Sequence, residues 1–240
     1  MKSITRHLVN LACVLSFFGL SACSTQPPLP LGPGGADPQR ELADRLQSKP
    51  EAAVLFIGNS YSFGVPRAFS KLATARGKKV RVGHSTYGGW TLRRHVENEA
   101  TLQKIRTGSW DVVVIQEQSE IPAMSARKCA AAMFPSLRVL VAEVRARNAI
   151  PVLYQTWGRR AGDPKLRDDD FHAMTGRLRS GYQAAARNAG GLLVVPVGDA
   201  WEREFSAGRG EGLFMPDGSH PTPLGNDLTA SVFYGKFFGK

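Results

Sequence analysis

The sequence predicts an α/β fold, a three-layer α/β/α sandwich with a central five-stranded parallel sheet. The first observation is that short runs rich in Val, Ile and Leu recur along the chain, at residues 53–57, 80–82, 111–115, 150–154 and 192–195. Unbroken apolar runs of this length are typical of strands that are covered on both faces. The second observation is that helix-length segments separate these runs. Strands that alternate with helices favour a parallel sheet with right-handed crossovers.

The segments between the strands carry apolar residues at spacings of three and four, which gives each helix one apolar face to lay on the sheet. Phe69, Leu72 and Ala73 form that face in the first segment. The predicted helices span residues 66–76, 91–106, 133–147 and 171–189, and a further apolar helix follows Pro221. Cys129 lies in an apolar, helical stretch and is predicted to be a small buried side chain.

Residues 1–22 are predicted to be a signal peptide that is removed on export. Lys2 and Arg6 precede an apolar run over residues 8–20, which is shorter than the roughly 20 residues that a membrane-spanning helix needs. The run ends in Leu-Ser-Ala before Cys23, which resembles the bacterial lipobox. We therefore expect Cys23 to be lipidated and to anchor the protein to a membrane, and Ser24 resembles the outer-membrane sorting pattern. An ordinary signal peptide with an incidental cysteine is the alternative.

Residues 23–50 are predicted to be a tether between this anchor and a folded domain over residues 51–240. Pro and Gly crowd residues 27–35, where neither a helix nor a central strand can form. The tether would space the folded domain from the membrane.

The composition excludes several classes of protein. With 42% hydrophobic and 21% charged residues the chain is not disordered as a whole, and three cysteines cannot make a disulfide scaffold. The net charge of +11 is compatible with an acidic partner. Lys and Arg are scattered, however, and no nucleic-acid motif accompanies them, so we expect a generally basic surface and no nucleic acid as partner.

Ligands of a parallel α/β sheet bind outside the carboxyl ends of its strands, so the residues that follow each strand are the candidates for chemistry. Ser60 follows the first strand just after Gly58, and Gly88 and Gly89 follow the second. Residues 116–119 follow the third strand and are polar, which is unusual because an unpaired buried polar group costs about 1–3 kcal/mol. Taken singly, Ser60 is better interpreted as a helix cap, and a plain turn is a competitive interpretation of the glycine pair.

Near the C-terminus, Asp217 stands three residues before His220 in a loop that contains glycine. A carboxylate at this spacing can accept the N–H of the imidazole and so fix its tautomer. The other ring nitrogen can then take a proton from a serine.

Together these motifs resemble the SGNH/GDSL hydrolase superfamily. The resemblance rests on Gly58-Asn59-Ser60 after the first strand, Gly88-Gly89 after the second, an amide after the third and Asp217-x-x-His220 near the end. It spans residues 53–237 and is greatest for the branch whose first motif is Gly-Asn-Ser and whose third is Gln-Glu-Gln-Ser. It implies the flavodoxin-like SGNH hydrolase fold.

The resemblance implies roles for three side chains, with Ser60 as nucleophile, His220 as general base and Asp217 as its orienting partner. It also implies an oxyanion hole formed by the backbone N–H groups of Ser60 and Gly89 and by a side-chain amide.

The chain departs from the superfamily pattern at two positions. The common Asp before the nucleophile is Asn59 here, and we interpret this position as structural. The third motif lacks its usual Asn. Gln118 fits the register and is predicted to supply the amide of the oxyanion hole, with Gln116 as the alternative.

Trp157 follows the fourth strand at the same edge. It is predicted to line the substrate pocket, where it could stack on a sugar ring, or else to be a packed core side chain. Residues 158–170 are predicted to be a surface loop beside the site. We expect no metal and no other cofactor. His84, His95 and His172 lack the spacing of metal ligands. The acids Asp168-Asp169-Asp170 precede Phe171 and suit the N-terminus of a helix.

We therefore expect a serine ester hydrolase of the cell envelope that works through an acyl-enzyme without a cofactor. The resemblance implies short acyl groups, acetyl above all, on carbohydrate esters as the substrate. An acylhydrolase for lipid or aryl esters is the alternative enzyme. A catalytically silent glycan-binding lipoprotein on the same fold is the alternative from another class, and the presence of Ser60, Asp217 and His220 together argues against it.

Overall fold

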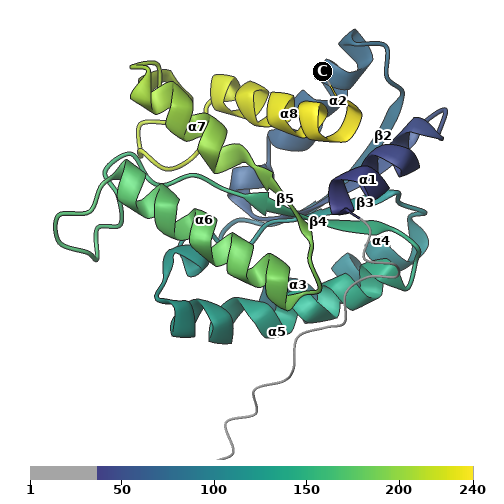
Figure 1. Cartoon of the computed structure of the whole chain (residues 1–240), viewed down its shortest axis with the longest axis horizontal. Coiled ribbons are helices and arrows are strands. Elements are labelled where there is room, and N and C mark those ends of the chain that lie inside the picture. The colour runs from purple at the N-terminus through teal and green to yellow at the C-terminus, as the bar shows by residue number, and fades with distance from the viewer. Residues whose placement is uncertain (1–36, 240) are drawn as a thin grey trace, which may run out of the picture.

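A parallel sheet with the strand order β2-β1-β3-β4-β5 forms the middle layer of the protein (Figure 1). The computed structural model describes residues 37–239. The predicted signal peptide, residues 1–22, and the predicted lipidation site, Cys23, lie outside the described residues. The strands are β1 (Ala52–Gly58), β2 (Val80–Thr86), β3 (Val112–Ile115), β4 (Ile150–Gln155) and β5 (Leu193–Pro196). Each apolar run singled out in the sequence is thus a strand, and the predicted fold class is confirmed.

Helices cover both faces of the sheet (Figure 1). One face carries α1 (Pro38–Gln47), α2 (Val65–Ala75), α7 (Val197–Ser206) and α8 (Pro223–Phe238). The other carries α3 (Leu92–Val96), α4 (Glu99–Thr107), α5 (Ala126–Arg145) and most of α6 (Phe171–Asn188). Successive side chains of a strand point to opposite faces, so β1 sends Val54 and Phe56 into one apolar core and Leu55 and Ile57 into the other. The described residues also form short 3₁₀ helices between these elements, namely η1 (Ser60–Ser62), η2 (Ile121–Ala123) and η3 (Glu211–Leu213).

The strand order places a switch in chain direction between β1 and β3. From β1 the chain moves outward to β2 and then returns to β3 on the opposite side of β1. The connections that leave β1 and β3 therefore diverge at the carboxyl edge of the sheet, which opens the crevice where ligands of such sheets bind. Ser60 follows β1 and the polar residues 116–119 follow β3 at this edge.

Two helices differ from the sequence prediction in their bounds. The segment predicted as one helix over 91–106 is divided, because the Asn98 side chain accepts the N–H of Thr101 at 2.8 Å and begins a new helix, α4. Helix α5 begins at Ala126 rather than at residue 133. Cys129 on α5 is 2% exposed, which confirms its predicted burial.

Helix α1 corrects the prediction of a tether over residues 23–50. The Asp37 side chain caps this helix by accepting the N–H of Gln39 at 3.0 Å, and Leu42 and Leu46 are buried in the same core as α8. Gln39 Nε2 also donates to the carbonyl of Lys236 on α8 at 2.8 Å. The folded domain therefore includes α1 instead of starting at residue 51. Two leucines four residues apart are too short a pattern to outweigh the surrounding Pro and Gly in the sequence.

We expect Leu42→Ala to lower the free energy of unfolding by about 2–5 kcal/mol, because it removes a fully buried side chain and leaves a cavity. Chemical denaturation measures the change. The matched control is Arg40→Ala on the exposed face of the same helix, which should stay within about 0.5 kcal/mol of wild type. Equal stabilities for the two variants would show that α1 does not belong to the folded domain.

Candidate active site

Ser60, His220 and Asp217 meet at the carboxyl edge of the sheet. Ser60 Oγ lies 2.9 Å from His220 Nε2, and Asp217 Oδ2 lies 2.5 Å from His220 Nδ1. Ser60 opens η1 directly after β1, whereas Asp217 and His220 come from the loop before α8. With Nδ1–H donating to the carboxylate, Nε2 is left to accept the proton of the Ser60 hydroxyl. The three side chains that the sequence pattern links are therefore brought together in a hydrogen-bonded relay, the geometry that proton transfer from Ser60 to His220 requires.

The loop that carries Asp217 and His220 is held by its own hydrogen bonds. Asp217 Oδ1 accepts the backbone N–H groups of Ser219 and His220 at 2.9 and 3.0 Å. Partial burial by itself raises the pKa of Asp217. The hydrogen bonds from the His220 ring and from these two N–H groups outweigh that effect and lower the pKa to about 2. Asp217 is therefore ionised at any pH at which the relay would operate.

The rings of Tyr61, Trp157 and Trp201 form a column that ends against the His220 ring. Tyr61 meets the His220 ring edge to face with centroids 5.5 Å apart, and it stacks on Trp157 at 4.8 Å. Trp157 in turn stacks on Trp201 at 3.7 Å. The Tyr61 hydroxyl lies 2.5 Å from Ser219 Oγ, and Trp157 Nε1 donates to the carbonyl of Ser219 at 3.1 Å.

This column corrects the placement of Trp157 in the substrate pocket. Trp157 is 0% exposed and has ring neighbours on both faces, so no face is left for a sugar. It is the core side chain of the alternative prediction. The sequence analysis missed Tyr61, although an aromatic side chain directly after Ser60 was visible as a signal.

The three groups assigned to the oxyanion hole all keep donors that bond no protein acceptor among the described residues. Gly89 has a φ of +69°, a conformation that favours glycine. Among residues 37–239, neither the Ser60 nor the Gly89 N–H donates to a protein acceptor. Gln118 Oε1 accepts the N–H of Glu120 at 2.8 Å, which fixes the plane of the Gln118 amide and leaves its NH₂ group to donate.

Gln116, the alternative amide, forms hydrogen bonds within the protein through both its oxygen and its NH₂ group. It is 0% exposed, and its Oε1 accepts from Asn59 N and from Ser62 Oγ, both at 2.9 Å. Its Nε2 donates to Asn59 Oδ1 at 3.0 Å and to the carbonyl of Glu117. Both amide hydrogens are thus engaged, so the alternative prediction for Gln116 is not supported. Asn59 has the structural place expected of it.

The other histidines and acids have structural or surface positions. His95 is buried, and burial lowers its pKa to about 4 although its ring bonds the carbonyl of Gly58. Asp170 caps α6, and Asp169 forms two hydrogen bonds of 2.7 Å with Arg177. Within the described chain, no group of three or more His, Cys, Asp or Glu side chains is placed to hold a metal ion. The described helices also include none long and apolar enough to span a membrane.

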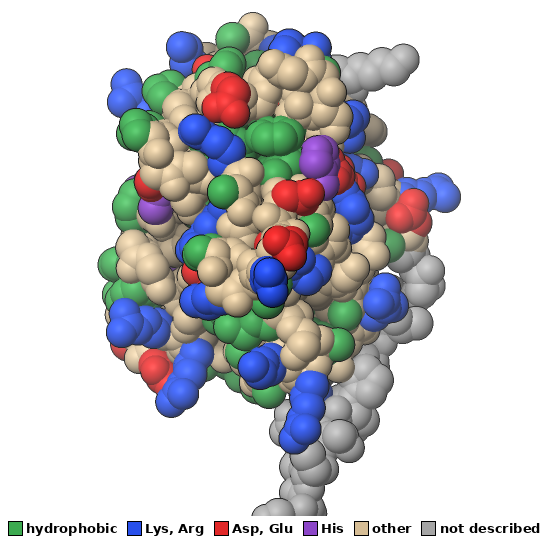
Figure 2. All heavy atoms as spheres, turned by 90° about the vertical axis from the view of Figure 1, so that its left-hand side faces the viewer, with side chains coloured by type: hydrophobic (Ala, Val, Ile, Leu, Met, Phe, Trp, Pro, Cys, Tyr) green, Lys and Arg blue, Asp and Glu red, His purple; other side chains and the backbone are tan. Residues whose placement is uncertain are grey.

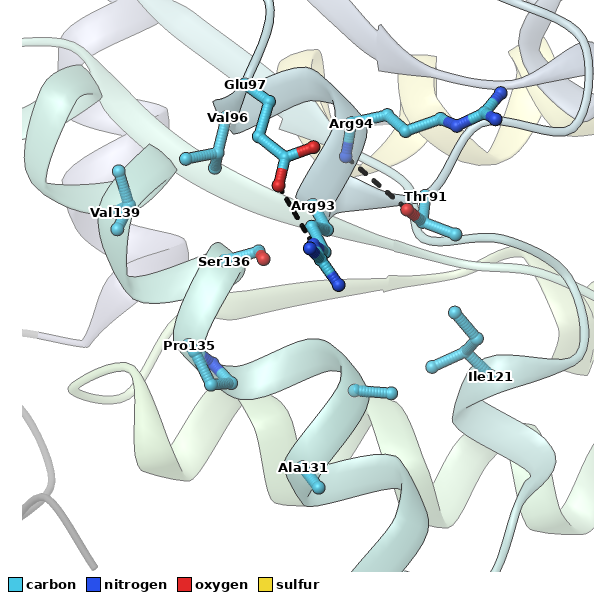
Figure 3. A pocket seen from close by; sticks show the side chains of 11 residues that line it. Thr91, Arg93, Arg94, Val96, Glu97, Ile121, Ala131, Pro135, Ser136 and Val139 are labelled. Carbon is cyan, nitrogen blue, oxygen red and sulfur yellow. Dashed lines mark hydrogen bonds and ion pairs between the residues drawn. The ribbon is translucent and has the colours of Figure 1, made fainter. Parts of the chain in front are cut away.

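A groove of about 710 Å³ lies between α3 and α5 and contains none of the three relay residues. Figure 3 shows Arg93, Arg94 and Glu97 on its α3 side and Pro135 and Val139 on its α5 side. Figure 2 shows that basic side chains are scattered over the face it draws, as the sequence predicts, rather than gathered in one patch.

A serine bonded to a histidine that a carboxylate orients, at the carboxyl edge of a parallel α/β sheet, is the arrangement found in serine hydrolases. No protein-family model and no curated protein matches the chain. Among solved structures, a protein from Slackia heliotrinireducens described as an SGNH hydrolase is 31% identical with a TM-score of 0.62. That match covers 78% of this chain and 98% of the other.

Two further structures share the fold. A DUF4886 family protein from Bacteroides uniformis is 21% identical with a TM-score of 0.70, and the match covers 79% of this chain and 84% of that one. An acetylxylan esterase from Geobacillus stearothermophilus, crystallised as a catalytic mutant, is 17% identical with a TM-score of 0.60, covering 78% and 94%. The chain belongs to the SGNH/GDSL hydrolase superfamily and is a hydrolase.

The two glutamines give a matched pair for testing the third donor. We expect Gln118→Ala to lower kcat for p-nitrophenyl acetate by ~10²-fold with an unchanged thermal unfolding midpoint, because the donor acts on charge that develops in the transition state. Gln116→Ala should instead lower the free energy of unfolding by about 1–3 kcal/mol, because it leaves buried partners unpaired. The reverse assignment of the two effects would move the donor role to Gln116.

Proposed function

We propose that the protein is a serine ester hydrolase that works through an acyl-enzyme. The observation that carries this proposal is the relay from Asp217 through His220 to Ser60, with both links at hydrogen-bonding distance. The hydrolases among its structural neighbours support the class of reaction.

In this mechanism Ser60 Oγ attacks the carbonyl carbon of the ester while its proton passes to His220 Nε2. Asp217 stabilises the imidazolium that forms. The N–H groups of Ser60 and Gly89 and the Gln118 amide receive the negative charge on the carbonyl oxygen. The imidazolium then protonates the leaving alcohol. Water next attacks the acyl-enzyme while His220 takes its proton, and the acid is released from Ser60.

We further propose short acyl groups, acetyl above all, on carbohydrates as the substrate. The acetylxylan esterase neighbour supports this choice. So do two exposed aromatic rings in the segments that follow β1 and β2 at the carboxyl edge of the sheet, because flat apolar faces pack well on sugar rings. Phe63 is 56% exposed and Tyr87 is 37% exposed. Phe63 follows η1, and its ring reaches to 4.0 Å from where a side chain of Gly88 would begin.

Lipid or aryl esters are the second candidate substrate, because other neighbours include a GDSL-like lipase from Parabacteroides merdae and because the same exposed rings can take an apolar group. We also propose that the enzyme works in the cell envelope, exported and lipid-anchored through Cys23 and facing the periplasm or the cell surface. The lipobox-like Leu-Ser-Ala-Cys sequence supports that location.

We expect Ser60→Ala to lower kcat/KM for p-nitrophenyl acetate by at least ~10³-fold, since it removes the nucleophile. Its thermal unfolding midpoint should stay close to wild type. A fluorophosphonate probe should label the wild type and not the variant. If the wild type takes no label and hydrolyses no ester from acetate to palmitate, yet binds an envelope glycan, the protein is a binding module.

We expect Phe63→Ala to raise KM for an acetylated xylo-oligosaccharide by ~10-fold and to leave p-nitrophenyl acetate kinetics unchanged, because the small ester does not reach the exposed ring. Val139→Ala, which removes an exposed apolar side chain from α5, is the control. If Phe63→Ala instead lowers activity only on long-chain esters, the lipid substrate is favoured.

We expect Cys23→Ser to abolish incorporation of labelled palmitate in a Gram-negative host and to leave precursor uncleaved or protein released. Cys13→Ser, which changes the other cysteine of the leader, should keep the label. A wild-type protein that takes up no palmitate would show that the leader is an ordinary signal peptide.

A further inference from the structure

The three candidate oxyanion donors come from three separate loops. Ser60 lies in the first loop, which follows β1. Gly89 lies in the second, between β2 and α3. Gln118 lies in the third, between β3 and η2. An oxyanion hole works only if its donors keep fixed positions relative to one another, because each must meet the same developing charge. The contacts between these loops therefore decide whether the donors converge.

Hydrogen bonds tie the first loop to each of the other two. Asn59 and Gln116 bond reciprocally and join the first loop to the third. Tyr87 N donates to the carbonyl of Gly58 at 3.2 Å, and Asn59 Nδ2 donates to the carbonyl of Trp90 at 3.4 Å, which joins the first loop to the second.

Glu117 closes the remaining side of this triangle. Its Oε1 accepts the N–H of Leu92 at 3.0 Å and the N–H of Gln118 at 2.7 Å, so one atom joins the start of α3, where the second loop ends, to the third loop. Leu92 is three residues from Gly89 and is the first residue of α3. No other side-chain hydrogen bond of the described residues joins residues 87–92 to the third loop.

Burying the Glu117 carboxyl group is energetically unfavourable, which sets it apart from an ordinary core side chain. The side chain is 0% exposed, and its second oxygen, Oε2, is buried with no hydrogen-bond partner in the described chain. Tyr182 on α6, whose hydroxyl accepts the N–H of Glu117, and Cys129 on α5 are the titratable groups that face it. Burial raises the pKa of Glu117 to about 7 against the two N–H groups that lower it. An apolar side chain would fill this place without that penalty but could not accept either N–H.

We propose that Glu117 is a positioning residue that holds the Gly89 N–H and the Gln118 amide in register with the Ser60 N–H by bonding both outer loops through one carboxyl oxygen. The proposal rests on the proposed ester hydrolase function. Glu117 does not touch the substrate, and its effect passes through Leu92 and Gln118.

Asp111 supplies a matched control at the opposite end of the same strand. It is 6% exposed, directly precedes β3, and accepts the N–H of Ala53 at 2.9 Å through Oδ2. Its Oδ1 pairs with Lys49 at 3.1 Å. Like Glu117, it is a buried carboxylate that ties β3 to its neighbourhood, but it lies at the amino edge of the sheet, away from the donors. Asp111→Ala therefore reports the effect of losing a buried carboxylate on stability alone.

The experiment compares Glu117→Ala, Glu117→Gln and Asp111→Ala with wild type, with p-nitrophenyl acetate as substrate at a temperature where all four are folded. We expect Glu117→Ala to lower kcat by ~10²-fold with KM within about threefold, because misplaced donors weaken transition-state binding. Glu117→Gln keeps an acceptor oxygen and should recover kcat to within about fivefold of wild type. Hydrogen exchange at the Leu92 and Gln118 N–H groups should be faster in the alanine variant and near wild type in the glutamine variant.

If Glu117→Ala leaves kcat unchanged, or loses no more kcat than Asp111→Ala at equal loss of stability, the positioning role is wrong. Failure of the glutamine variant to recover kcat would overturn it as well. If Glu117→Ala does not fold, Glu117→Asp, whose shorter side chain cannot reach both N–H groups, replaces it with the same expected loss. A wild type that hydrolyses no ester and takes no fluorophosphonate label overturns the proposed function itself, which is a different result from an active wild type with an active alanine variant.

Discussion

The reciprocal hydrogen bonds between Asn59 and Gln116 are the interaction on which the rest of the site depends. They join the ends of β1 and β3, the neighbouring strands where the chain changes direction, and both side chains are fully or almost fully buried. Amide groups at such a place would cost about 1–3 kcal/mol each if unpaired, and here each satisfies the other. Gly58 belongs to the same arrangement, because a side chain there would meet Gln116 Oε1 at 2.4 Å. This pair fixes the backbone from which Ser60 projects.

The histidine half of the site is built on a different kind of contact. Stacked rings and a short loop, rather than buried amides, place His220 over Tyr61. Residues 158–170 connect the two halves. Arg159 pairs with Glu120 beside Gln118, and the N–H of Arg160 donates to the carbonyl of Gly218 beside His220 at 2.8 Å. The long polar loop thus fastens the donor side of the site to the relay side.

The buried and the partly exposed polar side chains around the site have different roles. Gln116 and His95 are fully buried, and their hydrogen-bonding groups are used by the protein itself. Gln118 and His220 are partly exposed. Gln118 engages only its Oε1 with the protein, and His220 Nε2 bonds the Ser60 hydroxyl, the group that would react. Two glutamines two residues apart in one motif therefore have opposite roles. In a strand both would share a face, but β3 ends at Ile115 and the chain beyond it no longer keeps that alternation.

The sequence by itself determined the sheet and most of the helices, and its resemblance to the SGNH/GDSL hydrolases predicted the meeting of Ser60 with His220 and Asp217. Strand and helix patterns are local, and parallel strands must bring their carboxyl ends to one edge. Only the tertiary structure decided between Gln116 and Gln118, buried Trp157 in the core and added α1 to the folded domain. Those outcomes depend on partners that are distant in the chain. Gln116 and Asn59 are 57 residues apart, and Trp157 and Ser219 are 62 apart. Whether a polar or aromatic side chain is satisfied inside the protein or left to face a ligand depends on which distant groups pack against it, and no local pattern records that.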